Sequence, residues 1–159
     1  MDVPVITEPR VPMDASALAG KTRDTLRLGW EERRWTRKRV VSTSGRTVAL
    51  ALPTGSVLRI GDVIAVGDDW YLAVEARPEP VLAIQPRDRA EAIRVAFEVG
   101  NRHFSLAIDG ESLLVPDDVA MKILLTRLDV HWEPREAIYD PIGGGHRHTP
   151  AASEMNADG

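Results

Sequence analysis

The chain has 159 residues, of which 43% are hydrophobic, and its net charge is −4. The length suits one ordinary domain or two small ones, and the hydrophobic share is enough for a packed core, which argues against global disorder. The mild acidity argues against a main role in binding nucleic acid or anionic membranes, and the lack of cysteine excludes disulfides, thiolate zinc sites and cysteine nucleophiles.

Residues 1–18 come first along the chain and predict a flexible arm, because they are rich in proline and show no periodicity. They lack the apolar segment of a secretory signal, and no run of the chain approaches the length of a membrane span. We therefore expect a cytoplasmic protein without a membrane partner.

Residues 19–78 predict a small β domain. Short apolar runs with alternating side chains follow one another here, and no helical period is visible. The stretch "RKRVVSTSGRTVALAL" alternates around Ser44-Gly45, which predicts a hairpin. Gly55, Gly61 and Gly67 punctuate the next apolar runs at the spacing of a small sheet or barrel.

The period changes at residue 79. "PVLAIQP" predicts a strand, and Asp88 predicts the cap of a helix that closes at Gly100-Asn101. Asp109-Gly110 predicts a hairpin, Pro116 predicts the start of a second helix, and "DVHWEPREAI" predicts a last strand. The helical residues expected to face the core are Ile93, Ala96 and Phe97 in the first helix and Ala120, Ile123, Leu124 and Leu128 in the second.

This order of elements over residues 79–142, βαββαβ, is that of a ferredoxin-like domain. Together with the preceding β domain it predicts an α+β protein. Residues 143–159 contain almost nothing to bury and predict a flexible tail.

All four histidines lie in the second domain or its tail: His103, His131, His146 and His148. A single histidine at a helix end is often only a capping residue, and two histidines in a tail often have no function. A two-fold dimer would, however, bring two copies of His103 together, and the glycines before His146 would let the tail imidazoles reach the same ion. Such a nitrogen-rich site without thiolates suits Ni²⁺, Cu²⁺ or Zn²⁺. His131 ranks below the other three, because its place in "LDVHWEP" also fits a solvent-facing strand position.

Residues 31–47 form a basic segment with two tryptophans beside it, Trp30 and Trp35. The basic residues are Arg33, Arg34, Arg37, Lys38, Arg39 and Arg46, against Glu31 and Glu32. This composition leaves open a module that binds RNA or a peptide, although a charged edge strand that discourages pairing explains it as well. We find no serine elbow, phosphate-binding loop, dinucleotide glycine pattern or HExxH motif, so we do not expect an enzyme.

Several stretches together resemble the UreE family of urease accessory proteins over roughly residues 37–146. The first is "SGRTVALALPTGSVLRIGDVIAV", with Leu52-Pro53, Gly55, Leu58 and Gly61-Asp62 at the family's spacing. The most specific is "GNRH" at 100–103, followed by "LLVPDDVAMKILLTRLDV". "REAIYDPIGGGHRH" is similar to the segment that leads into the family's histidine-bearing tail.

The resemblance implies a nickel metallochaperone with an N-terminal β domain likened to peptide-binding domains of chaperones and a ferredoxin-like metal-binding domain. It implies a homodimer through the second domain, in which the motif histidine of both subunits, here His103, binds Ni²⁺ as cargo. Tail histidines, here His146 and His148, complete or supply that site, and Zn²⁺ or Cu²⁺ could occupy it. The implied partners are the accessory GTPase and apo-urease.

This chain departs from the family pattern at four places, one of which is Gly144-Gly145-His146 in place of the usual Gly-Ala-Tyr. The proline that often follows two residues after the motif histidine is Ser105 here, and the usual Pro-Phe is Ile138-Tyr139. The tail carries two histidines in place of a long run, which predicts few nickel ions per dimer.

Overall fold

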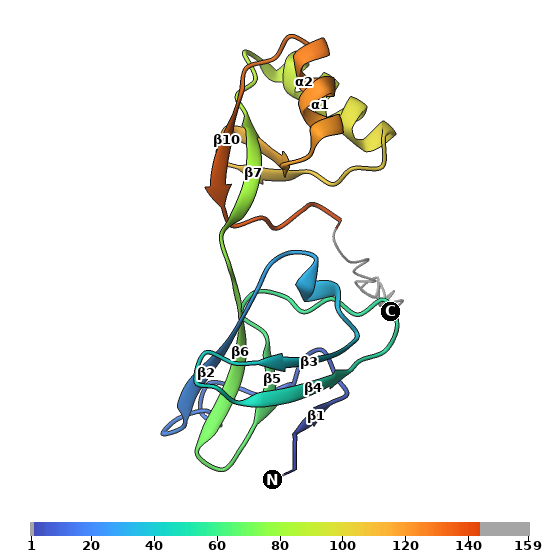
Figure 1. The fold of residues 1–159 in the computed structure, drawn as a ribbon. Coiled ribbons are helices and arrows are strands. Elements are labelled where there is room, and N and C mark those ends of the chain that lie inside the picture. The colour runs from blue at the N-terminus through green and yellow to red at the C-terminus, as the bar shows by residue number, and fades with distance from the viewer. Residues whose placement is uncertain (1, 144–159) are drawn as a thin grey trace, which may run out of the picture.

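The computed structural model describes residues 2–143. Figure 1 shows two parts, one built only of strands and a short turn of helix, the other with both α-helices. The N-terminal part contains β1 (Val5–Ile6), β2 (Thr22–Leu28), the 3₁₀ helix η1 (Glu32–Arg34), β3 (Arg37–Val41), β4 (Thr47–Ala51), β5 (Val63–Val66) and β6 (Trp70–Ala76). The C-terminal part contains β7 (Glu79–Ile84), α1 (Arg89–Asn101), β8 (Ala107–Asp109), β9 (Ser112–Pro116), α2 (Val119–Arg127) and β10 (Trp132–Ala137).

The N-terminal part is two three-stranded sheets, in the orders β1-β4-β3 and β2-β6-β5. Their apolar side chains share one core, in which Leu26, Val48, Leu58 and Leu72 are almost completely buried. The predicted hairpin is confirmed, because β3 and β4 pair antiparallel with Val41 opposite Thr47. Gly45 in its turn has a φ of 89°, which glycine adopts without a steric cost.

Residues 2–18, expected as a flexible arm, are tied to this part at two points. β1 pairs parallel with β4, and Ile6 enters the core with only 4% of its surface exposed. Farther on, the Val11 amide donates to the Val63 carbonyl at 2.8 Å. A two-residue strand is too short to produce a periodicity, which is why the sequence shows none.

A buried carboxylate, Asp24, connects β2 to the β3–β4 hairpin. It accepts hydrogen bonds of 2.6 Å from the hydroxyls of Ser42 and Ser44, and the Thr25 and Ser44 amides also donate to it. Burial alone would raise the pKa of Asp24, but these hydrogen bonds to the charged form outweigh it and hold the pKa at about 2. The hairpin is therefore attached to β2 by an ionised group.

The C-terminal part has the predicted element order, and its sheet runs β10-β7-β9-β8 with every neighbouring pair antiparallel. Both helices pack on one face of this sheet, where Leu82, Ile84 and Val115 meet them. The other face is covered by Tyr139, which is fully buried, and by Trp30 from the N-terminal part. The protein is therefore a mixed α and β fold, as the α+β prediction requires.

The helices confirm the predicted start and end of the first helix and correct the start of the second. Asp88 caps α1 by accepting from the Glu91 amide at 2.8 Å. Pro116 does not open α2 but ends β9, and the cap of α2 is Asp118, whose carboxylate accepts from the amides of Ala120 and Met121. Neither helix of the described residues is long and apolar enough to cross a membrane.

The predicted buried faces of the helices are wrong at most positions, although Leu124 is buried and Leu128 packs against the core as expected. The residues that face the core are Val95 and Val99 in α1 and Met121, Leu124 and Leu125 in α2. Ile93 and Phe97 are 60% and 67% exposed, and Ile123 is 56% exposed. Each helix carries more apolar residues than one sheet face can cover, and helical spacing alone cannot say which set is covered.

Candidate functional site

The His103 turn lies at the C-terminal end of α1. The helix ends at Asn101, so the predicted stop at Gly100-Asn101 is confirmed. The residue that reverses the chain is His103, with a φ of 61°. Its amide donates to the Gly100 carbonyl at 3.0 Å, and the Phe104 amide donates to the Val99 carbonyl at 3.2 Å. These two hydrogen bonds form a Schellman motif, whose left-handed position is usually occupied by glycine.

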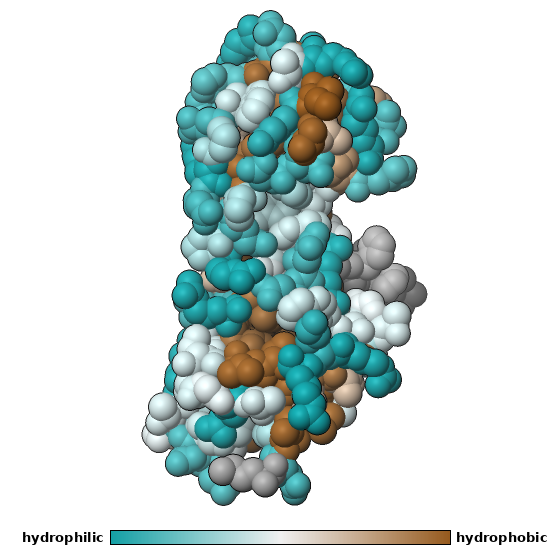
Figure 2. All heavy atoms as spheres, in the orientation of Figure 1, coloured by the Kyte–Doolittle hydropathy of each residue, from teal (hydrophilic) through white to brown (hydrophobic). Residues whose placement is uncertain are grey.

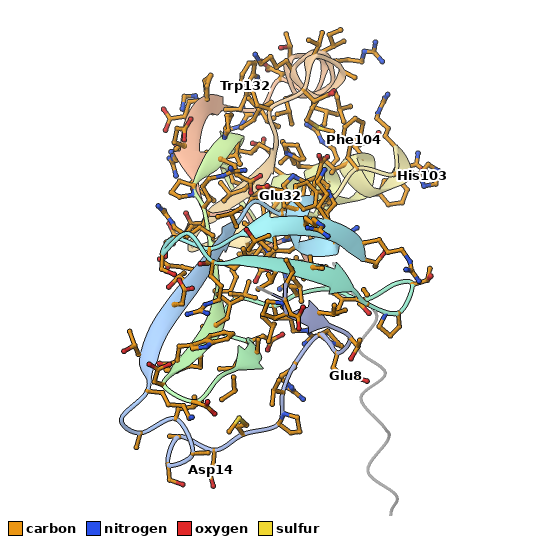
Figure 3. All side chains as sticks on the ribbon, turned by 60° about the horizontal axis from the view of Figure 1, so that its bottom comes forward. Glu8, Asp14, Glu32, His103, Phe104 and Trp132 are labelled. Atoms are coloured by element: carbon orange, nitrogen blue, oxygen red, sulfur yellow. The ribbon has the colours of Figure 1, made fainter. Side chains whose placement is uncertain are left out.

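His103 holds this left-handed position with a β-carbon, at a steric cost of roughly 1–2 kcal/mol. Among the described residues other than glycine, only Asp129 shares a positive φ. The imidazole is exposed, and Figure 3 shows it at the outer edge of the molecule. The turn therefore displays the imidazole to solvent, and it does not use it to fill the core.

Two hydroxyl groups anchor the chain just after this turn. The Ser105 hydroxyl lies 2.7 Å from the Tyr139 hydroxyl, and Tyr139 is fully buried. Burial raises the pKa of Tyr139 to about 12, although the hydrogen bond with Ser105 lowers it, so the phenol stays protonated and can donate. Both positions are places where this chain departs from the pattern of the family that it resembles, and no local sequence pattern predicts that they touch.

Tyr139 also joins the His103 turn to the N-terminal part. Its ring meets the Trp30 ring edge to face, with centroids 5.4 Å apart. Its carbonyl accepts from the Arg33 guanidinium at 2.5 Å, and Arg33 also donates to the Leu28 carbonyl at 3.0 Å. Sequence reasoning named Arg33 only as part of the basic segment and Tyr139 only as a departure from the family pattern, and it missed the contact between them, because they lie far apart in the sequence.

The structure does not gather the other predicted ligands around His103. His131 lies one residue before β10, is exposed, and accepts from the Gln85 amide through its backbone carbonyl. His146 and His148 lie outside the described residues. Within residues 2–143, no three side chains of His, Asp or Glu come close enough to hold a metal ion.

The basic segment lies mainly on the edge strand β3. Arg37 and Arg39 are exposed there, as expected of a charged edge. The Trp35 ring packs against the N-terminal core, with the Lys38 ammonium 4.7 Å from its centroid. Trp30 is engaged by Tyr139 and by the Arg34 guanidinium. Because both rings already have partners, the arrangement argues against stacking of RNA bases.

An apolar face runs along α1 toward the His103 turn. Ile93 and Phe97 lie one helical turn apart and are both exposed, and Gly100 follows one turn later. A β-carbon at Gly100 would have no atom within 4 Å, so nothing in the described chain covers this position. Figure 2 shows apolar side chains on the surface of the helical end. This face is unpartnered within the described chain.

Comparison with known proteins gives one consistent result. The N-terminal domain of the UreE urease accessory protein family matches residues 7–77, and its C-terminal domain matches residues 79–158. The urease accessory protein UreE of Burkholderia ambifaria is 35% identical over 144 residues, which cover 88% of this chain and 70% of that protein. Those of Ralstonia nicotianae and Paraburkholderia xenovorans are 33% and 34% identical, covering 86% and 80% of this chain but 67% and 59% of their own length.

Proposed function

Because the chain belongs to the UreE family of urease accessory proteins, we propose that it is a nickel chaperone that delivers Ni²⁺ for assembly of the urease nickel centre. The family is named for an accessory role to urease and not for an enzyme activity. The cargo ion binds to the imidazole of His103. The observation that carries this proposal is the exposed imidazole in a left-handed position where glycine would be less strained.

One imidazole cannot hold a nickel ion, so the site is completed by a second copy of the chain. A two-fold axis beside the α1 end places two His103 side chains face to face. The exposed Ile93 and Phe97 support this arrangement, because they lie on the same helix and lead toward the turn. The exposed Gly100 allows a second backbone to approach closely. The dimer therefore covers the apolar face and forms the metal site together.

His146 and His148 supply further imidazoles to the same ion. A nitrogen-rich site of this kind also accepts Zn²⁺ and Cu²⁺, while the absence of cysteine disfavours Cu⁺. His131 is not needed for binding. Exchange of the ion between His103 and these two histidines suits its release better than its storage.

In this proposal the chain is divided at the predicted boundaries. They give an arm over 1–18, a peptide-binding-like β domain over 19–78, a ferredoxin-like nickel-binding domain over 79–142 and a histidine-bearing tail over 143–159. The strand order β10-β7-β9-β8 with two helices on one face supports the ferredoxin-like assignment. The partners are the accessory GTPase and apo-urease, and the protein works in the cytoplasm.

Calorimetric titration of Ni²⁺ into the full-length, metal-free protein tests the site. We expect one tight ion per two chains, and His103→Ala should weaken binding by more than about 100-fold, since even partners that only orient a ligand contribute 10- to 100-fold. Asp129→Ala is the matched control, because it changes the same turn position at the end of α2. Tight binding that persists in His103→Ala would refute the assignment.

The dimer has its own test. Phe97→Asp should give monomers in sedimentation velocity and lose tight nickel binding with them. Val41→Asp is the control, since Val41 is an apolar residue of similar exposure, 62%, on the N-terminal part. A Phe97→Asp protein that remains dimeric would place the interface elsewhere.

A further inference from the structure

A cleft of about 450 Å³ lies between the two parts of the chain. Its walls come from η1, from the loop before β5 and from the segment after β10, and they include Arg33, Arg34, Val57, Arg59, Ile60 and Pro141. We call it the arginine cleft. None of these residues belongs to the nickel site proposed above.

The three arginines of the cleft are not equivalent. Arg33 is 3% exposed, and its guanidinium is already used by the carbonyls of Leu28 and Tyr139. Within residues 2–143, neither Arg34 nor Arg59 forms an ion pair, and neither guanidinium donates a hydrogen bond. The Arg34 guanidinium lies 5.4 Å from the centroid of the Trp30 ring. Two guanidinium groups are therefore available to a ligand.

The cleft is positively charged in a chain that is acidic as a whole. Asp140 is the one acidic residue among its described lining residues, against three arginines. A net charge of −4 for the whole chain makes this local excess of positive charge stand out. Guanidinium groups bind carboxylates through pairs of parallel hydrogen bonds, so an anion with carboxylates fits.

Apolar residues line the cleft between the arginines. Val57 and Pro141 are half-buried, and Ile60 is 43% exposed. The neighbouring Ile142 is 60% exposed. An apolar wall beside guanidinium groups suits a polypeptide that carries apolar side chains as well as acids. No helix N-terminus of useful length is present at the described walls to favour a bare phosphate, since η1 has three residues.

We propose that the arginine cleft binds an acidic segment of a partner protein, in which carboxylates meet Arg34 and Arg59 and apolar side chains meet Val57 and Ile60. Bound there, the segment contacts both parts of the chain at the joint where Tyr139 meets Trp30 and Arg33. This site goes beyond nickel binding and does not require metal.

The test uses full-length protein in the presence of a chelator and a fluorescent peptide in which Glu and Val alternate. A matched peptide carries Gln in place of Glu. Anisotropy should show binding of the Glu peptide and at least about tenfold weaker binding of the Gln peptide, because the charges provide the recognition. Arg34→Glu with Arg59→Glu should weaken the Glu peptide by at least about tenfold as well.

The control reverses two arginines outside the cleft, Arg37→Glu with Arg39→Glu, and should leave the affinity within about twofold. Amide and indole NMR shifts on the wild type, where no variant can misfold, should move at Trp30 and Ile60 and not along β3. Equal loss in both double variants, equal binding of the Gln peptide, or no binding would overturn the proposal.

Two further outcomes assign the cleft to something else and would also overturn it. Glu154→Gln with Asp158→Asn could raise the peptide affinity tenfold or more, which would make the chain's own tail the occupant. Alternatively, a single-stranded RNA could bind the wild type and lose that binding in the Arg34→Glu with Arg59→Glu variant while peptide binding is unaffected. That result would make the arginine cleft a phosphate site. Because all these measurements exclude metal, their failure leaves the nickel titration untouched.

Discussion

The two helices of the C-terminal part end in turns of the same type. At the α1 end, His103 has a φ of 61° and its amide bonds to the Gly100 carbonyl at 3.0 Å. At the α2 end, Asp129 has a φ of 54° and its amide bonds to the Thr126 carbonyl at 3.1 Å. In each case the next amide donates to the carbonyl five residues earlier, so the two helix ends have the same pattern of backbone hydrogen bonds.

The anchors of the two turns differ. The α1 end is followed by the part-buried contact between the Ser105 hydroxyl and the buried Tyr139. The α2 end is held from the surface, where Arg94 donates to the Leu128 carbonyl at 2.8 Å and Arg87 to the Asp129 carbonyl at 3.1 Å. An internal anchor keeps the α1 turn in place while its outer surface stays open. The comparison teaches that two turns of the same shape can differ in the side chain that they display and in the contacts that support them.

The largest effect should come from removing the internal anchor. Tyr139→Ala should lower the free energy of unfolding by about 3–5 kcal/mol, as for other large buried aromatic residues. Tyr139→Phe keeps the ring and removes only the hydroxyl, so it should cost about 1 kcal/mol. Urea unfolding measures both values.

A double-mutant cycle decides whether the hydroxyls act as a pair. Tyr139→Phe and Ser105→Ala should each cost about 1 kcal/mol, and the double variant should cost less than their sum. Strict additivity would mean that the 2.7 Å contact contributes nothing, and the proposed difference between the two helix ends would fail.

Acid should weaken the protein at a place that neither helix end controls. The pKa of Asp24 is about 2 in the fold against an ordinary 3.8, so its ionised form stabilises the folded state above pH 4. That contribution, about 2 kcal/mol, should be lost as the pH falls from about 4 to about 2. Urea midpoints across this range should fall in wild type and stay flatter in Asp24→Asn, which starts less stable.

The same acid series sharpens the comparison of the turns. His103→Gly and Asp129→Gly should both show the wild-type fall between pH 4 and pH 2, because neither residue touches Asp24. A different slope in one of the glycine variants would mean that its helix end is coupled to the hairpin of β3 and β4.

The sequence predicted the elements that local chemistry determines. The hairpin at Ser44-Gly45, the cap at Asp88 and the βαββαβ order depend on short-range signals, and all three are present. It could not predict which helical face is covered, because Phe97 and Val95 are both apolar and only packing against the sheet decides which of them is buried.

For the candidate site, the sequence allowed the residue to be predicted but not its backbone conformation or its neighbours. The motif pointed to His103, yet it assigned the chain reversal to Gly100-Asn101, since glycine is the usual left-handed residue. The contact of Ser105 with Tyr139 joins positions 34 residues apart and leaves no local pattern. Whether two copies of His103 meet stays a prediction.

Glycine substitutions compare the strain of the two turns directly. His103→Gly should raise the free energy of unfolding by about 0.5–1 kcal/mol, because glycine has no β-carbon to strain, even after its larger entropy in the unfolded chain. Asp129→Gly should raise the free energy of unfolding by less, since aspartate tolerates a positive φ better than histidine does. His103→Ala keeps the β-carbon and should leave the free energy of unfolding unchanged, although on the nickel proposal it should lose nickel binding as His103→Gly should. A destabilised His103→Gly would show that the imidazole supports the fold.

The smallest effect should come from the surface anchor of α2. Arg94→Ala removes the hydrogen bond to the Leu128 carbonyl, but water can replace it at this exposed site, so the cost should stay within about 0.5 kcal/mol. The control is Arg127→Ala at the last residue of α2, which removes an exposed arginine without removing this hydrogen bond. Thermal unfolding should place the two variants close together. A loss in Arg94→Ala as large as that in Tyr139→Phe would mean that the outer anchor supports its turn as firmly as the inner one, and the two helix ends would then differ only in the side chain that they display.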